Sequence, residues 1–340
     1  MKKIFLTTGL IIVLLIGSKN INAQYYFFDG EYYDNPILYE AGISVNAMNC
    51  LTDIGGKKGI GTKFLKDLNI GKTHLSGGVF FSIAYKNAVA FRLEGTFGQI
   101  SGNDNVLVGI TDIAKERYNR NLNFRSYIID VTAMLELHPM YIFIDWPAKE
   151  TTPPRTSPYI VGGIGYFSFN PQTKQGNRYI DLQPLSTEGQ GFAEYPERKV
   201  YKLNQINIPL GAGVKYEVSP LINARAEVVY RTTFTDYLDD ISTTYKNPST
   251  LGSPEAVALS NRTPELGSSV DPAFAKNFGY DAANGVEQKR GDKTHKDSYM
   301  TMSLSYSYVI KGKSSFYRGH YGHFFGKHKR GKVRKIRAKF

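Results

Sequence analysis

The sequence predicts an all-β fold, an eight-stranded antiparallel transmembrane β-barrel with long external loops and a basic C-terminal tail. Eight segments alternate between apolar and polar residues with a period of two, as strands with two different faces do. The chain has 24 Tyr, 20 Phe and 33 Gly, and this richness in aromatic residues and glycine favours β-structure over helices. The connections between the segments alternate between short and long, which is typical of membrane-spanning barrels.

The first four segments each carry an apolar row on one face. These rows are Ile37, Tyr39, Ala41, Ile43 and Val45; Leu75, Gly77, Val79, Phe81 and Ile83; Val89, Phe91, Leu93 and Phe97; and Tyr127, Ile129, Val131, Ala133, Leu135 and Leu137. The residues between them are polar or small. Each segment is about ten residues or longer, which is enough for a tilted strand to cross a bilayer.

The last four segments follow the same rule, with one weaker member. The fifth, residues 157–169, is rich in glycine and has an unclear register. The apolar rows of the others are Ile206, Ile208, Leu210, Ala212 and Val214; Ala224, Ala226, Val228 and Tyr230; and Met300, Met302, Leu304, Tyr306 and Tyr308. The strand glycines are expected to permit tight curvature, since no helix follows them as a nucleotide-binding loop would require.

The connections indicate which ends of the strands lie together. Residues 85–88 and 217–221 form tight turns, whereas 49–71, 104–122, 170–203 and 235–296 are long. The join at 139–157 is the exception, because it is long and proline-rich where a short turn is expected. An even number of strands leaves both ends of the barrel on one side. The sheet must close on itself, because lipid cannot hydrogen-bond an open edge.

The polar faces predict a filled interior rather than a pore. Cations and anions both point inward, and in a small lumen they are expected to pair; they are Arg92, Lys215, Arg225 and Arg231 with Glu40, Glu94, Asp130, Glu136 and Glu227. An eight-stranded barrel has room for side chains but not for an aqueous channel. A selective channel would need a wider lumen or charges of one dominant sign.

The N-terminus has the features of a secretory signal peptide, residues 1–23. Lys2 and Lys3 precede an apolar run of about 13 residues, and Ala23 stands at the expected cleavage point. That run is too short to span a bilayer as a helix. A short segment, 24–36, then leads into the barrel, residues 37–310. Cys50 is the only cysteine, so no internal disulfide is expected.

The basic tail, residues 311–340, is the predicted partner-binding segment. It has eleven cationic residues and no Asp or Glu; they are Lys311, Lys313, Arg318, Lys327, Lys329, Arg330, Lys332, Arg334, Lys335, Arg337 and Lys339. Nucleic acid is an unsuitable partner for a chain exported by a signal peptide. Anionic lipid and an acidic protein surface fit the charge equally well.

Two motifs stand out in the long loops. One is Thr187, Glu188, Gly189, Gln190 and Gly191; the other is Thr235, Asp236, Tyr237, Leu238, Asp239 and Asp240. On these motifs the chain resembles the PorG family of Bacteroidetes outer-membrane proteins over roughly residues 37–310. The resemblance implies an OmpA-like barrel in the outer membrane with both termini in the periplasm. It also implies a non-enzymatic part of the type IX secretion system that is associated with the periplasmic ring of PorK and PorN. The basic tail lies outside the part of the chain that shows the resemblance, and we expect it to contact this ring or the inner leaflet.

The same residues leave alternatives open. Asp236, Asp239 and Asp240 could gather Ca²⁺, although caps of loop backbone are favoured because the spacing is not that of a calcium loop. No nucleophile with a matched histidine is identifiable, and no cofactor or metal site is expected. The rival functions are a general OmpA-like envelope barrel, whose tail binds anionic lipid, lipopolysaccharide or cell wall, and, less favoured, a lipid-modifying barrel enzyme.

Overall fold

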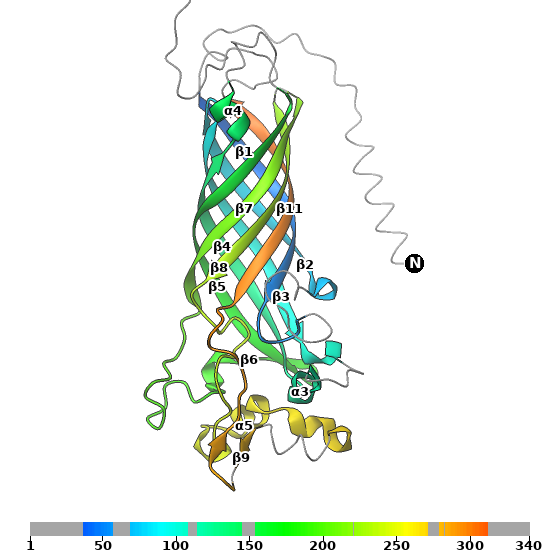
Figure 1. Ribbon diagram of the computed structural model, residues 1–340, viewed down its shortest axis with the longest axis vertical. Helices are drawn as coiled ribbons and strands as arrows, with labels where there is room; N and C mark the ends of the chain where they lie inside the picture. Colours follow the sequence, from blue (N-terminus) through cyan, green and yellow to red (C-terminus); the bar gives the residue numbers. More distant parts are fainter. Residues whose placement is uncertain are drawn as a thin grey trace, which may run out of the picture.

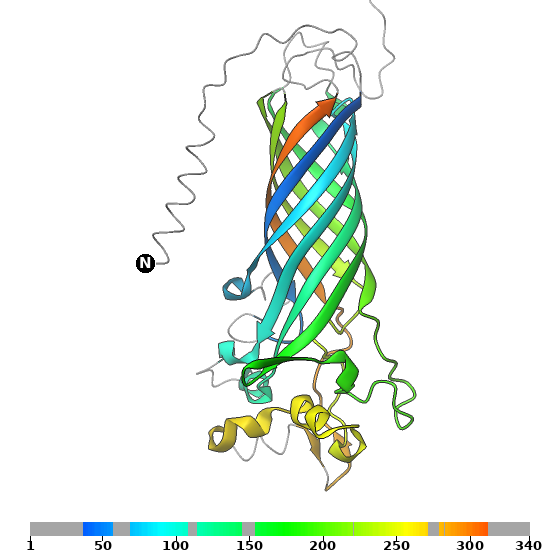
Figure 2. The ribbon, with the colours of Figure 1, turned by 180° about the vertical axis from the view of Figure 1, so that it is seen from behind.

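The computed structural model describes residues 37–56, 69–107, 114–144, 154–219, 221–270, 279–281 and 283–311. Eight long strands form a closed antiparallel barrel (Figures 1 and 2). They are β1 (Ile37–Leu51), β2 (His74–Tyr85), β3 (Val89–Asn103), β4 (Asn123–Leu137), β5 (Thr156–Gln175), β7 (Asn204–Ser219), β8 (Ile222–Thr233) and β11 (Ser298–Lys311). Each strand pairs with its neighbour in the chain, and β1 pairs with β11 to close the sheet. The predicted fold class is confirmed.

The outward face of the barrel is a continuous apolar belt. The register places Ile43 of β1 beside Val79 of β2 on one side and Tyr306 of β11 on the other. These side chains are largely exposed, Ile43 to 63% and Leu304 of β11 to 70%. A closed sheet with such a belt satisfies every ladder hydrogen bond internally and presents only apolar surface to lipid. None of the described helices has the length and hydropathy that a bilayer span requires.

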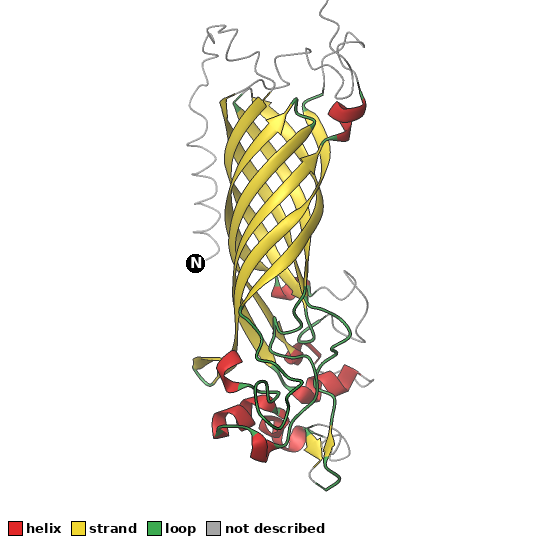
Figure 3. Cartoon of the chain, turned by 90° about the vertical axis from the view of Figure 1, so that its left-hand side faces the viewer, coloured by secondary structure: helices red, strands yellow, loops and turns green. Residues whose placement is uncertain are grey.

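The tight turns lie at one end of the barrel. Lys86 and Asn87 both have positive φ angles, 52° and 54°, as the two central residues of a type I′ turn do, and the Ala88 amide donates to the Tyr85 carbonyl at 3.0 Å. The helix α4 (Pro139–Phe143) lies at this end as well (Figures 1 and 3). The join predicted to be irregular therefore begins with one helical turn, and Pro139 at its start suits the first position of a helix.

The lumen is filled by paired charges. Arg92 contacts Glu94, Glu136 and Glu227 at 3.3, 3.2 and 2.7 Å. Glu40 receives both Lys215 and Arg225, and Arg231 lies 2.7 Å from Asp130. The side chain of Arg92 is only 2% exposed. The predicted pairing of the interior charges is confirmed. Breaking one of these buried pairs would leave an uncompensated charge, which is strongly destabilising.

The opposite end of the barrel is covered by short elements and closed by an apolar cluster. They are η2 (Ile70–Lys72), η3 (Asp104–Leu107), α3 (Ala114–Arg120), β6 (Arg178–Asp181), η5 (Gln183–Leu185), η6 (Pro248–Thr250), α5 (Pro254–Ser260), η7 (Thr263–Ser269), β9 (Tyr280–Asp281) and β10 (Val286–Glu287). Phe167, Ile128 and Tyr299 from the barrel pack with Leu238 and Ile241 from the last long loop. Strand β5 runs six residues beyond the predicted Phe169, because its extension forms a hairpin with β6.

Several predicted segments fall outside the described residues. They are the signal peptide at 1–23, the segment 24–36 and the tail from 312 onward. The first strand begins at Ile37 and the last ends at Lys311. These two ends are adjacent, since Tyr39 pairs with Lys311. The barrel therefore starts and finishes at the end where the tight turns lie.

Candidate functional site

The four long connections gather at one end of the barrel, and we call their described residues the loop lobe (52–56, 69–73, 104–107, 114–122, 176–203, 234–270, 279–281 and 283–297). Figure 3 shows the lobe beyond the barrel mouth, opposite α4. Both sequence motifs lie in it. Their residues are mostly buried, and the two segments contact each other directly, which their separation of about fifty residues does not reveal.

Glu188 is the centre of the contact between the motifs. Its carboxylate accepts hydrogen bonds from the backbone amides of Ser242 and Thr243 at 3.0–3.2 Å and from the Thr243 hydroxyl at 2.6 Å. Arg290 adds an ion pair at 3.0 Å. All the acceptor capacity of this carboxylate is used by the protein. Glu188 therefore binds two loops together and is not available as a base.

Asp240 makes the second link. Its two oxygens accept from the Thr187 hydroxyl at 2.5 Å and from the Tyr201 hydroxyl at 2.6 Å. Arg290 also donates to the backbone carbonyl of Asp240, at 2.8 Å. Thr187 and Asp240 come from different long loops. Neighbouring residues of the first motif, Thr187 and Glu188, thus hold the C-terminal end of the second motif and the segment that follows it.

The glycines of the first motif are required by backbone geometry. Gly189 has φ +73° and Gly191 has φ +80°, in the region that favours glycine. A Cβ at Gly189 would also lie 2.5 Å from the ring of Tyr195, and one at Gly191 would lie 2.7 Å from Val200. The spacing Gly-Gln-Gly therefore encodes a compact turn. Gln190 completes it by accepting the Glu188 amide at 3.0 Å.

The remaining aspartates of the second motif cap backbone amides and a hydroxyl. Asp239 accepts from the amides of Ile54 at 2.9 Å and Ile241 at 3.1 Å. Asp236 accepts from the Ser242 hydroxyl at 2.6 Å. The capping of backbone amides is confirmed for Asp239, whereas Asp236 and Asp240 accept hydrogen bonds from side-chain hydroxyls instead. No group of three or more potential metal ligands occurs in the part of the chain that the structure describes, so the calcium alternative has no support there.

Burial shifts the acidity of this cluster. Loss of solvation raises the pKa of Asp236 to about 7, and it raises the pKa of Asp240 to about 6 against the opposing effect of Arg290. Burial also raises the pKa values of Asp239 and Asp297, and the charge of the neighbouring carboxylates acts in the same direction. The loop lobe thus contains carboxyl groups that titrate between about pH 5 and 8.

Three arginines that the sequence did not single out connect the loops. Arg120 makes two contacts with Asp104, at 2.9 and 3.0 Å, and donates to the carbonyls of Asp53 and Arg290. Arg290 joins Glu188 to Asp240 as described above. Arg198 donates to the Glu188 carbonyl at 3.0 Å and to Thr243 and Thr244. An isolated arginine in a long loop has no local pattern, so only the folded chain reveals these roles.

The structure also brings together a serine, a histidine and a glutamate inside the barrel. His138 Nδ1 lies 2.9 Å from the Ser157 hydroxyl, and Nε2 lies 3.5 Å from Glu136. This pair was not predicted from the sequence, because 19 residues separate His138, which follows β4, from Ser157 in β5. Ser157 is 5% exposed and His138 3%, and Glu136 already pairs with Arg92. This arrangement has the residue types of a hydrolytic triad, but buried contacts within the lumen account for it.

The predicted partner-binding residues of the tail are almost entirely beyond the described chain. Lys311 ends β11. The others, Lys313, Arg318, Lys327, Lys329, Arg330, Lys332, Arg334, Lys335, Arg337 and Lys339, lie outside the described residues. Their role stays a prediction.

With this geometry in view, a family assignment follows from a sequence profile described as "Domain of unknown function (DUF6089)", which matches residues 29–252, more than half of the chain. The chain belongs to the DUF6089 family. The match covers β1 to β8 and both motifs, and it ends before β11. No curated protein matches the sequence significantly.

Among solved structures, this DUF6089 protein is similar to small outer-membrane barrels. Neisserial surface protein A is 8% identical, with 81% of this chain and 98% of that chain covered and a TM-score of 0.33. Outer membrane protein W of E. coli is 12% identical, with 82% and 100% covered and a TM-score of 0.33. A major outer membrane protein of Thermus thermophilus is 11% identical, with 81% and 100% covered and the same score.

Proposed function

We propose that this DUF6089 protein is a non-enzymatic, non-conducting anchor in the outer membrane and a component of the type IX secretion system. The observation that carries the proposal is the filled lumen. A barrel whose interior charges are paired and buried has no continuous water path for a substrate. Such a barrel is suited to anchoring a partner at the membrane and not to conducting a substrate across it.

The balance of interior charge supports this view. The lumen contains both signs within one network, with Arg92 in contact with three carboxylates and Glu40 in contact with two cations. A selective pore requires a ring of one sign or a wide aqueous passage. At the far end, the apolar cluster around Phe167 and Leu238 packs across the mouth. Both features favour a barrel with a closed interior over a barrel that conducts solutes.

The site geometry supports a non-enzymatic role. The motif carboxylates Glu188 and Asp239 are occupied by backbone amides, and the hydroxyl of Ser157 is buried in the lumen. A catalytic group must reach its substrate within hydrogen-bonding distance. The motifs therefore preserve the shape of the loop lobe, and we assign partner contact to exposed surfaces and to the tail.

The proposed secretion role rests on two observations. One is the resemblance to the PorG family, and the other is that the first and last strands terminate at the same end of the barrel. Both ends of the barrel emerge beside α4, at the end with tight turns. In barrels of this type the short turns face the periplasm, so this end would face a periplasmic ring. The tail from Lys311 onward then begins at the membrane surface where a PorK and PorN ring would bind. Eleven cations without a carboxylate suit an acidic protein surface.

Purification of the detergent-extracted complex from its own envelope tests the proposal. We expect PorK and PorN to co-purify with the wild-type chain and to be lost when the eleven tail cations are replaced by Gln, while the barrel still inserts. A deletion strain should fail to secrete type IX cargo. Normal secretion in a clean deletion, or steady single-channel conductance of the purified barrel, would rule out this role.

A general OmpA-like envelope barrel is the second candidate, because the plugged lumen fits it equally well. Here the tail would bind anionic lipid, lipopolysaccharide or cell wall instead of a protein ring. The same purification separates the two. Recovery of lipid or cell-wall fragments through the tail, with no ring protein and normal cargo secretion, favours this candidate.

A further inference from the structure

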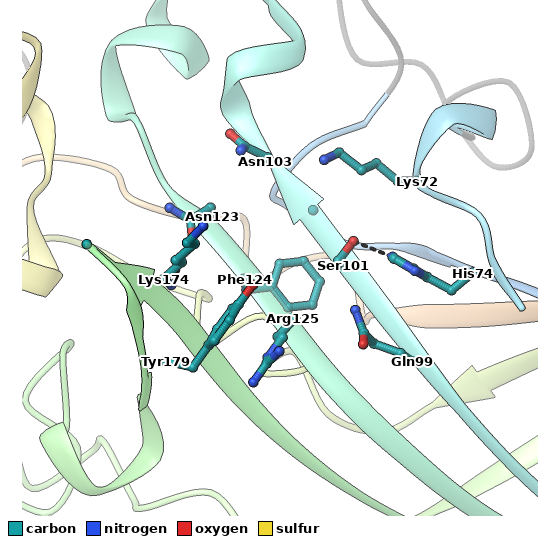
Figure 4. A pocket seen from close by; sticks show the side chains of 12 residues that line it. Lys72, His74, Gln99, Ser101, Asn103, Asn123, Phe124, Arg125, Lys174 and Tyr179 are labelled. Atoms are coloured by element: carbon teal, nitrogen blue, oxygen red, sulfur yellow. Dashed lines mark hydrogen bonds between the residues drawn. The ribbon is translucent and has the colours of Figure 1, made fainter. Parts of the chain in front are cut away.

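An open groove of about 350 Å³ lies where β3, β4 and β5 extend towards the loop lobe (Figure 4). It is separate from the contact between the two loop motifs. Four basic side chains lie along its lining, those of Lys72, His74, Arg125 and Lys174 (Figure 4). Amide and hydroxyl groups of Gln99, Ser101, Asn103 and Asn123 fill the space between them. Two aromatic rings, those of Phe124 and Tyr179, also line the groove (Figure 4).

The groove begins directly beyond the lipid-facing belt. Phe97 and Tyr127 stack on the outer surface, with ring centroids 6.3 Å apart and an angle of 4° between the rings. Aromatic rings at the boundary of an apolar belt mark the level of lipid headgroups. Arg125 precedes Tyr127 by two residues on the same face of β4, which is about 7 Å along the strand. The groove is therefore at headgroup height, with exposed apolar residues such as Leu93 on its membrane side.

Its cations lack the partners that other basic residues in this protein have. Arg92, Arg231 and Arg290 are each paired with a carboxylate. Lys72, Arg125 and Lys174 have no carboxylate within 4.0 Å among the residues that the structure describes. The nearby Asp181 instead accepts from the side-chain amides of Asn170 at 3.0 Å and Gln172 at 2.7 Å. Among the described residues, these three cations are therefore not neutralised by a direct ion pair.

The groove is also preorganised. Arg125 Nε donates to Gln172 at 3.0 Å, and its guanidinium carbon lies 3.1 Å from the centre of the Tyr179 ring. His74 Nε2 lies 2.7 Å from the Ser101 hydroxyl (Figure 4). The terminal guanidinium nitrogens of Arg125 have no acceptor in the described part of the chain. A fixed guanidinium whose two terminal nitrogens are unused matches the paired oxygens of a phosphate group.

We propose that this groove binds the phosphorylated sugar headgroup of a glycolipid in the leaflet that surrounds the loop end of the barrel. Arg125, Lys72 and Lys174 contact the phosphate, and the neighbouring amides and hydroxyls contact sugar oxygens. The acyl chains lie against the apolar belt beside Phe97 and Leu93. The groove's height at the headgroup level selects a lipid over a soluble anion. This inference concerns the membrane and does not depend on the secretion role.

The test is a binding titration of the full-length protein in neutral detergent micelles, with lipid A as the probe. Wild-type protein should bind lipid A and lose most of this affinity for the dephosphorylated lipid. The triple variant Lys72→Gln/Arg125→Gln/Lys174→Gln should bind lipid A at least about tenfold more weakly, because each surface cation contributes roughly fivefold to anionic lipid binding. Retention of heat-modifiable mobility on gels checks that the variant is folded.

A matched control removes the same charge elsewhere in the lobe, in Lys199→Gln/Lys293→Gln/Lys296→Gln, at residues that are all exposed. This control should bind lipid A as wild type does. Equal weakening in both triple variants would overturn the site. If the wild-type protein bound lipid A and dephosphorylated lipid A equally well, the phosphate contact would be ruled out. This comparison needs no variant. Equal competition by millimolar inorganic phosphate or by phosphatidylglycerol would overturn the assignment to a sugar lipid.

Discussion

Glu188 and Arg290, which are 102 residues apart in the chain, form a buried ion pair at 3.0 Å in the middle of the loop lobe. The carboxylate is fully buried and the guanidinium is 2% exposed. Through this pair the third long loop is fixed to the fourth. Because Arg120 also donates to the Arg290 carbonyl, the second long loop joins the same network.

Replacing Glu188 by Gln should loosen the loop lobe while leaving the barrel intact. The substitution leaves a buried guanidinium without its nearest carboxylate, and breaking one partner of a buried pair costs about 3 kcal/mol or more. Limited proteolysis should therefore cut the lobe many times faster. The control is Glu197→Gln, since the side chain of Glu197 is 66% exposed where it meets Arg198, and exposed pairs contribute little. Equal protease resistance of both variants would contradict the role of Glu188.

The loop lobe should become more stable as the pH falls from 8 to 5. The pKa values of Asp236 and Asp240 are about 7 and about 6 in the folded protein, whereas an unfolded Asp titrates near ~3.9. In this range the folded state binds more protons than the unfolded state, so the free energy of unfolding rises as the pH decreases. Asp292 does not oppose the trend, because its pKa is lowered to about 2 and it stays ionised in both states.

Near-ultraviolet circular dichroism of the stacked Tyr201 and Tyr237, whose ring centroids are 4.6 Å apart, reports on this lobe. Its thermal midpoint should be higher at pH 5 than at pH 8. The variant Asp236→Asn should raise the midpoint at pH 8 and reduce its dependence on pH. A midpoint that increases with pH would contradict the burial of these carboxyl groups.

The sequence predicted the barrel far better than the lobe, and the reason is the range of the signals. A strand with one face in lipid and one in the lumen repeats every two residues, so rows such as Val89, Phe91 and Leu93 identify it locally. The contact between Glu188 and Arg290 depends on two loops of irregular length meeting in space. No periodicity precedes it, and only the folded chain identifies the arginine.

The groove lies between these two cases. Arg125 continues the outward row of β4, so its orientation follows from the alternation. Its neighbours in the groove come from elements that the sequence did not predict: Lys72 from η2, and Tyr179 from β6, which pairs with the extension of β5. Convergence of three separate segments produces the site. The position of Arg125, just beyond the outward-facing Tyr127, could have suggested a basic surface here from the sequence. It could not have predicted the groove.

Replacing Gly189 by Ala should destabilise the loop lobe more than the same change at Gly176. Both residues have positive φ, +73° and +58°, so both substitutions carry the strain of about 1–2 kcal/mol for a Cβ in that region. Only Gly189 adds a steric conflict, because its Cβ would lie 2.5 Å from the Tyr195 ring, whereas nothing lies within 4 Å of a Cβ at Gly176. The thermal midpoint of the tyrosine signal should fall further for Gly189→Ala. Equal losses would mean that the turn can relax away from Tyr195.

An arginine on the outer belt should destabilise the barrel according to its depth. Leu93 lies within the outward row of β3, and Gln99 lies on the same face of the same strand beyond Phe97. The two positions therefore differ in their expected depth in the membrane. We expect Leu93→Arg to cost about 2–4 kcal/mol, since a cation there must leave water for hydrocarbon, and Gln99→Arg to cost roughly 0–1 kcal/mol. Urea unfolding in neutral lipid vesicles, followed by gel mobility, measures both. If Leu93→Arg cost no more than Gln99→Arg, the row would face water, and the belt would not be the surface that holds this protein in a membrane.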